Sequence, residues 1–233
     1  MVIDGLVVGA LTGLIDVHLA ISAIPTILSG LPMSLFLLVA CFILANILGF
    51  ILVLVRQSRW AILRWLARFY ISFFRGVPML VILFITYFGF NMDAIPAAIL
   101  SFTIAPAAFI SDYYRSALLG VDIGQYEAAR SLGMNRYVVL RYVILPQALR
   151  IVFPSLGNVM VDMFKGTSLA AMITVSEMFM DAKIVAGANQ DYMSIYITLA
   201  FIYWLLCCVL SWGQSWLEKR LDFVAKAEES RNA

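Results

Sequence analysis

The sequence predicts an all-α integral membrane protein with about five transmembrane helices. Of its 233 residues, 63% are hydrophobic and only 13% are charged, whereas charged residues make up about 25% of a soluble domain. Apolar runs recur at lengths that cross a bilayer core, which takes about 20 residues of helix. The basic residues gather at one side of these runs. The length allows one domain, and the formal net charge of +2 gives no reason to expect a nucleic-acid partner.

The first predicted span is Leu31–Val55, which contains no charged residue and is followed by Arg56. The second predicted span is Val77–Phe90, and a helical stretch, Trp60–Phe74, leads into it. This second span is short for a bilayer, so its fit depends on tilt and on the preceding helix.

The third predicted span is Ala94–Leu119. The fourth starts near Pro146 or Pro154 and reaches Lys165, because proline is favoured in the first turn of a helix. The fifth is Met193–Gly213, flanked by tyrosine and tryptophan residues of the kind that anchor helices at a membrane interface.

The basic residues are distributed asymmetrically about these spans. They follow span one, fill the loop between spans three and four, and follow span five: Arg56, Arg59, Arg64, Arg68, Arg130, Arg136, Arg141, Arg150, Lys219, Arg220, Lys226 and Arg231. The N-terminal tail carries Asp4 and no basic residue. Cytoplasmic loops carry the excess of Lys and Arg, so we expect the N-terminus outside and the C-terminus in the cytoplasm. We expect an external or interfacial segment 1–30, a membrane domain 31–217 and a charged cytoplasmic tail 218–233.

The composition excludes several kinds of chemistry. His18 is the only histidine, and Cys41, Cys207 and Cys208 all lie in apolar runs, so no metal site is expected. The sequence contains no G-x-x-x-x-G-K-[ST] phosphate loop, so the chain cannot hydrolyse ATP alone.

The loop 122–146 between spans three and four has the pattern of a short docking helix. Asp122 is a candidate N-cap, with Gln125 reaching back as in a capping box. Ala128 and Ala129 give the helix a low-profile face, and Gly133 ends it in the left-handed conformation. Such a helix at the membrane surface suits the groove of another protein.

Three stretches resemble the membrane subunits of ABC importers. The run Glu127-Ala128-Ala129, with Gly133 and then Ile144-Leu145-Pro146, resembles their EAA loop. Phe74-Arg75-Gly76-Val77-Pro78 resembles the FRG-x-P stretch of polar amino-acid permeases, and Lys165-Gly166-Thr167-Ser168-Leu169 resembles their K-D-T-S-L element. The chain is therefore identified as a member of the type I ABC importer permeases, in the polar amino-acid family.

The resemblance implies a function and a set of partners. It implies an importer that moves an amino acid across the bacterial inner membrane, with cystine or a related polar amino acid favoured. The implied partners are a dimer of ABC ATPase subunits that binds ATP and Mg, a second permease subunit (identical or related), and an extracytoplasmic solute-binding protein. The residues implied to contact the ATPase are Gln125, Tyr126, Glu127, Ala128, Ala129, Arg130 and Gly133. The alternative is a secondary transporter or channel not driven by ATP.

The spans contain two pairs of ionisable residues, Asp112 with Arg115 and Asp162 with Lys165. Each pair is three residues apart and can meet on one helix face. Either the pairs neutralise themselves, with Arg115 reaching the headgroups, or they line a polar cavity for a zwitterionic substrate.

Gly166 suggests a broken helix, with Thr167 or Ser168 capping the next segment and free amides aimed, with Lys165, at a carboxylate. The family usually has Asp at this position, so we expect Asp162 to replace the missing carboxylate in part. Arg75 is either an anchor for backbone carbonyls or a substrate contact. A capping box, Thr174 to Glu177, predicts an external helix over Val175–Ile184.

Overall fold

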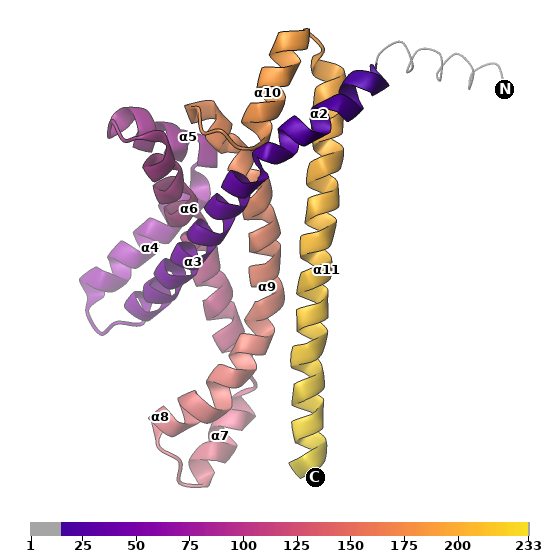
Figure 1. Ribbon diagram of the computed structural model, residues 1–233. Coiled ribbons are helices and arrows are strands. Elements are labelled where there is room, and N and C mark those ends of the chain that lie inside the picture. Colours follow the sequence, from indigo (N-terminus) through magenta and orange to yellow (C-terminus); the bar gives the residue numbers. More distant parts are fainter. Residues whose placement is uncertain (1–14, 233) are drawn as a thin grey trace, which may run out of the picture.

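Every element in the described part of the chain is helical in the computed structural model (Figure 1). The structure describes the backbone of residues 15–232 and the side chains of residues 15–220, so Asp4, Lys226 and Arg231 lie outside the described side chains. The helices, in chain order, are α2 (Val17–Ser29), α3 (Leu31–Arg56), α4 (Ala61–Gly76), α5 (Met79–Phe84), α6 (Ala94–Leu119), α7 (Ile123–Ser131), α8 (Arg136–Val139), α9 (Leu145–Gly166), α10 (Met178–Asn189) and α11 (Tyr192–Asn232).

Four stretches of helix are long and apolar enough to cross a membrane: Leu31–Arg56, Ala94–Leu119, Arg136–Ile173 and Tyr192–Arg220. They correspond to the first, third, fourth and fifth predicted spans. Within the fourth stretch, helix α9 begins at Leu145, which places Pro146 in the first turn of α9 and Pro154 inside the helix.

The second predicted span is one half of a bent pair. Helix α4 and the segment Met79–Gly89 meet at an angle of 106°, and only together are they long and apolar enough to count as a fifth span. The bend lies at Val77, whose backbone is extended, directly before Pro78. Proline disfavours the helical conformation in the residue before it, which ends α4 here.

Helices α3 and α6 pack closely along most of their length, and small residues allow the approach. The buried face of α3 repeats about every four residues, through Leu37, Cys41, Ala45 and Gly49. A Cβ added at Gly49 would lie 2.7 Å from Cγ2 of Ile110 on α6. Small residues four apart let helix backbones approach, and here they fix α3 against α6.

At the end opposite α7 and α8, helix α2 lies across α10 and α11 (Figure 1). The amide of Asp16 donates to Oγ of Ser194 at 2.8 Å. The turn from α2 into α3 touches the start of α10 so tightly that a Cβ at Gly30 would lie 2.4 Å from the carbonyl carbon of Glu177. The described part of the predicted segment 1–30 is therefore a packed helix.

The predicted external helix is present but starts later and is longer. Helix α10 is capped by Glu177, whose carboxylate accepts from the amide of Met180 at 3.0 Å. Thr174 adopts a left-handed conformation and its hydroxyl donates to the neighbouring carbonyl of Ile173. The predicted capping box from Thr174 is therefore wrong, because that residue ends the preceding segment instead.

Candidate functional site

A groove of about 430 Å³ runs between the bend after α4, the middle of α6 and the last third of α9. We call it the central groove. Aromatic and apolar side chains form its walls, and Asp162 is the only acidic or basic residue among its described lining residues: Phe74, Val77, Met79, Phe102, Ala105, Pro106, Phe109, Tyr113, Val159, Asp162, Met163, Gly166 and Leu169. It thus has the composition of a small-molecule site, mostly apolar with one orienting charge.

Asp112 links three helices beside this groove. Its Oδ1 accepts from Nη1 of Arg56 at 2.6 Å, and its Oδ2 accepts from Nη1 of Arg75 at 2.5 Å. Arg75 also lies over the ring of Phe109, a groove residue, with 5.5 Å from its Cζ to the ring centroid. Both arginines use planar donors suited to a carboxylate. Neither prediction for Arg75 anticipated this ion pair.

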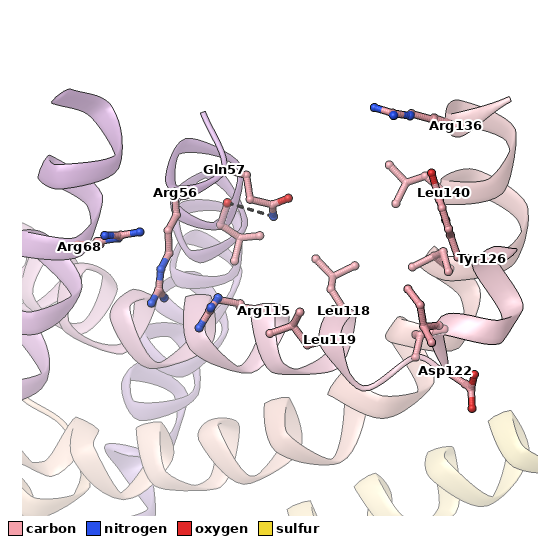
Figure 2. Close-up of a pocket in the computed structure, with 14 residues that line it drawn as sticks. Arg56, Gln57, Arg68, Arg115, Leu118, Leu119, Asp122, Tyr126, Arg136 and Leu140 are labelled. Carbon is pink, nitrogen blue, oxygen red and sulfur yellow. Dashed lines mark hydrogen bonds between the residues drawn. The ribbon is translucent and has the colours of Figure 1, made fainter. Parts of the chain in front are cut away.

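The predicted pair of Asp112 with Arg115 does not form. Arg115 is exposed and lines a second, basic pocket at the end of α6 (Figure 2). The two carboxylate oxygens of Asp112 are already taken by arginines from α3 and α4.

The other predicted pair, Asp162 with Lys165, is confirmed. Nζ of Lys165 lies 2.7 Å from Oδ1 of Asp162, and the two side chains are 55% and 73% exposed. Lys165 and Ser168 line a shallower groove of about 280 Å³ toward α10 and α11, whereas Asp162 lines the central groove. The ion pair therefore connects two grooves across the surface of α9.

The predicted helix break at Gly166 is wrong. Gly166 has helical dihedral angles, and the chain continues into a 3₁₀ segment, Thr167–Ile173. The hydroxyl of Thr167 donates to the carbonyl of Phe164, and that of Ser168 donates to the carbonyl of Lys165, both at 2.7 Å. These hydroxyls bond backward to carbonyls of α9, so neither of them caps a new helix.

Sequence reasoning missed a buried polar cluster around Glu177. The carboxylate is fully buried, and its Oε2 accepts from Ser34 at 3.3 Å and from the hydroxyl of Tyr203 at 3.1 Å. Burial raises the pKa of Glu177 above its ordinary value. A glutamate at the N-cap of a helix outside the spans is ordinarily solvated, so the sequence alone offered no reason to expect its burial. The polar Ser34, in the first turn of span one, was the only sequence signal of a hydrogen-bond partner for it.

Helix α7 has the predicted start and end. Oδ1 of Asp122 accepts from the amide of Gly124 at 2.6 Å, and Gly133 is left-handed with φ of 80°. Among the described residues, the Gln125 side chain makes no return bond to Asp122, so the cap is single rather than reciprocal. Nη1 of Arg130 donates to the carbonyl of Met134 at 2.6 Å and so closes the following loop.

The two alanines of α7 differ in their environment. Ala129 is buried within the subunit, whereas Ala128 is exposed together with Glu127. Ile123, the first residue of α7, and Leu132, the residue that follows its end, are 70% and 80% exposed. Helix α7 therefore presents a large exposed apolar side chain at each end, with the small exposed Ala128 between them.

Comparison with known proteins identifies this arrangement. Residues 45–223 match the family model of the binding-protein-dependent transport system inner membrane component. The chain belongs to this family. The probable amino-acid ABC transporter permease protein YckA of Bacillus subtilis (strain 168) is 44% identical over 210 residues, covering 88% of this chain and 93% of that protein. The L-cystine transport system permease protein TcyB of the same organism is 39% identical over 209 residues, covering 87% of this chain and 89% of that protein.

A solved structure confirms the fold of the permease. The crystal structure of an amino acid ABC transporter with histidines aligns at a TM-score of 0.83 and 31% identity, covering 88% of this chain and 99% of that one. The resemblance inferred from the three motifs is therefore confirmed, and the chain is a permease of the amino-acid ABC transporter type in a bacterial inner membrane. A binding protein and a separate ATPase complete such a system.

Proposed function

We propose that this permease imports a zwitterionic amino acid, with cystine or a related polar amino acid as the favoured substrate. The 39% identity to an L-cystine permease supports this substrate class. We further propose that the N-terminus faces outward and that loop 122–146 and the tail 218–233 are cytoplasmic, because the basic residues gather on that side.

The observation that carries the proposal is the exposure of the Asp162–Lys165 pair. Both side chains are more than half exposed, although they lie within a candidate span. Charged groups in contact with lipid are costly, at least about 2.5 kcal/mol each, so charges in spans face a water-filled path or a partner subunit. This face of α9 therefore borders the translocation path, completed by a second permease subunit, identical or related.

The same pair suits an amino acid chemically. A substrate ammonium can take Oδ1 of Asp162 while the substrate carboxylate takes Nζ of Lys165, so one ion pair is exchanged for two and no charge is left unpaired. Thr167 and Ser168 support this segment by tightening it into a 3₁₀ turn. Arg75 and Asp112 hold the wall beside Phe109, and we assign them a positioning role.

The proposed contact with the ATPase is α7 with its flanking residues Gln125 to Gly133. The exposed Ala128, between Ile123 and Leu132, is the part that another protein can cover. Closure of the ATPase dimer on ATP would move this helix, and the motion would shift the membrane helices between two packings.

The proposal is tested by reconstituting the permease in liposomes with its ATPase and binding protein. Uptake of radiolabelled cystine, arginine, glutamine and glutamate is then measured with ATP inside and with ATP omitted. We expect ATP-dependent uptake that is greatest for cystine. Uptake that needs an ion gradient but no ATPase would instead establish a secondary transporter, and equal uptake of all four would reject the substrate assignment.

A further inference from the structure

A second cavity, of about 530 Å³, lies where α3 and α6 end, between these ends and α4, α7 and α8 (Figure 2). We call it the basic pocket. It contains neither Asp162 nor Lys165, so the substrate path accounts for none of it.

Four arginines from four helices converge on the basic pocket. Arg56 ends α3, Arg68 lies on α4, Arg115 lies in the last turns of α6 and Arg136 begins α8. Figure 2 shows Arg68 reaching toward Arg56 and Arg115, while Arg136 points back across the opening. Positive charges gathered in this way repel one another, and an anion bound between them would offset that repulsion.

The chain itself supplies little negative charge here. Asp122 is the one carboxylate among the described lining residues, and its Oδ1 is occupied by the amide of Gly124. Arg56 is paired with Asp112. Within residues 15–220, Arg68, Arg115 and Arg136 have no ion-pair partner.

The remainder of the basic pocket is apolar. Leu118 and Leu119 form its floor between the arginines and Leu140 on the opposite wall. Trp60, directly before α4, and Trp65, on α4, are 73% and 64% exposed, as in aromatic belts at the level of lipid headgroups. A cavity that combines guanidinium groups with an apolar floor at the end of membrane spans matches a phosphate attached to a glycerol and acyl chains.

We propose that the basic pocket binds the phosphate of an anionic phospholipid headgroup. Arg68 and Arg115 donate to the phosphate oxygens in the bidentate manner of guanidinium groups, and Leu118 and Leu119 contact the glycerol end. Because the pocket includes Tyr126 of α7, a bound lipid holds the docking helix against the ends of α3 and α6. The inward position of the pocket rests on the orientation proposed above.

The test is native mass spectrometry of the assembled transporter in detergent, titrated with short-chain phosphatidylglycerol or phosphatidylcholine. Lipid binding in detergent does not depend on membrane orientation or on the transported substrate. A negative lipid-binding result can therefore be distinguished from a negative result in the amino-acid import assay. We expect phosphatidylglycerol to bind in preference. The double variant Arg68→Gln/Arg115→Gln should lower its affinity about tenfold or more, as expected for two lost charge-assisted hydrogen bonds.

The matched control is Arg59→Gln/Arg141→Gln, which removes the same charge at arginines outside the basic pocket and should leave the affinity unchanged. Arg68→Lys/Arg115→Lys, which keeps the charge but not the planar donors, should bind with intermediate affinity. Equal loss in the control would overturn the proposal, as would equal binding of the two lipids.

Two further results would also overturn it. Full competition by glycerol phosphate at equal concentration would assign the pocket to a free phosphate. Loss of the ATPase from the complex in the Gln variant, with lipid binding intact, would assign it to an acidic segment of the partner protein.

Discussion

Nζ of Lys165 lies 2.7 Å from Oδ1 of Asp162, three residues earlier on α9, so these two charges near the end of α9 neutralise each other. A substrate that enters must separate them or bind to both. A zwitterion can therefore replace this one ion pair with two, one to Asp162 and one to Lys165.

Lys165→Ala should abolish tight substrate binding while leaving assembly intact. The change removes the only ammonium at this face of α9, and a lost charge-assisted hydrogen bond corresponds to about tenfold or more in affinity. The measurement is the apparent affinity for cystine in proteoliposomes, with ATPase activity as the assembly check. Lys183→Ala, an exposed lysine on α10, is the control. Unchanged affinity in Lys165→Ala would exclude this residue from the site.

Gly166→Asp should be accepted by the fold and should change the charge preference of transport. A Cβ at Gly166 meets no atom within 4 Å, and its dihedral angles suit any residue. The new carboxylate would join Asp162 in the central groove and favour a cationic amino acid. Competition uptake of arginine against glutamate should rise about tenfold in favour of arginine. Gly166→Asn, equal in size but neutral, should leave the ratio unchanged; if both variants shift it alike, size rather than charge is the cause.

Ala128 and Ala129 should respond oppositely to enlargement. Ala128→Glu changes an exposed position, so thermal stability should change by no more than about 0.5 kcal/mol, while ATPase binding is lost. Ala129→Leu overfills a buried position and should cost about 1–3 kcal/mol. Co-purification of the ATPase and thermal unfolding separate the two effects. Normal ATPase retention in Ala128→Glu would contradict the assignment of α7.

Glu177 should make the stability of the permease fall as pH rises. Burial raises the pKa of Glu177, so the folded state holds its proton more tightly than the unfolded state. Its stabilising effect is complete below the ordinary pKa of about 4.5 and is lost as pH rises through the higher folded pKa. Thermal unfolding in nanodiscs between about pH 4 and about pH 8 should show a smaller decline in Glu177→Gln than in the wild type. Glu127→Gln, at an exposed position, should behave like the wild type; parallel curves for Glu177→Gln would refute the role of Glu177.

Hydropathy was enough to place four of the five predicted spans, because lipid imposes a length and an apolar composition on each helix. The bend at Val77 was also encoded locally, in the proline that follows, although the sequence analysis did not predict its 106° angle. Short-range rules likewise located the start of α7 at Asp122 and its left-handed end at Gly133.

Long-range pairing could not be predicted in the same way. The partners of Asp112 lie 56 and 37 residues earlier, so the nearer Arg115 was the natural but incorrect choice. Glu177 follows the same logic, since its burial arises only when the turn at Gly30 and helix α11 close over it. At Gly166, the backward bonds of two hydroxyls favour continued winding over the break that glycine suggested.

The ion pairs of Asp112 also bear on how the permease is made. Arg56 and Arg75 both precede Asp112 in the chain, so the two arginines are synthesised before the carboxylate with which they pair. If the helices insert in chain order, both arginines are present at the ends of α3 and α4 when Asp112 on α6 enters the membrane. Reversing that order, for instance by circular permutation, would place Asp112 in the bilayer before Arg56 and Arg75 are available to pair with it.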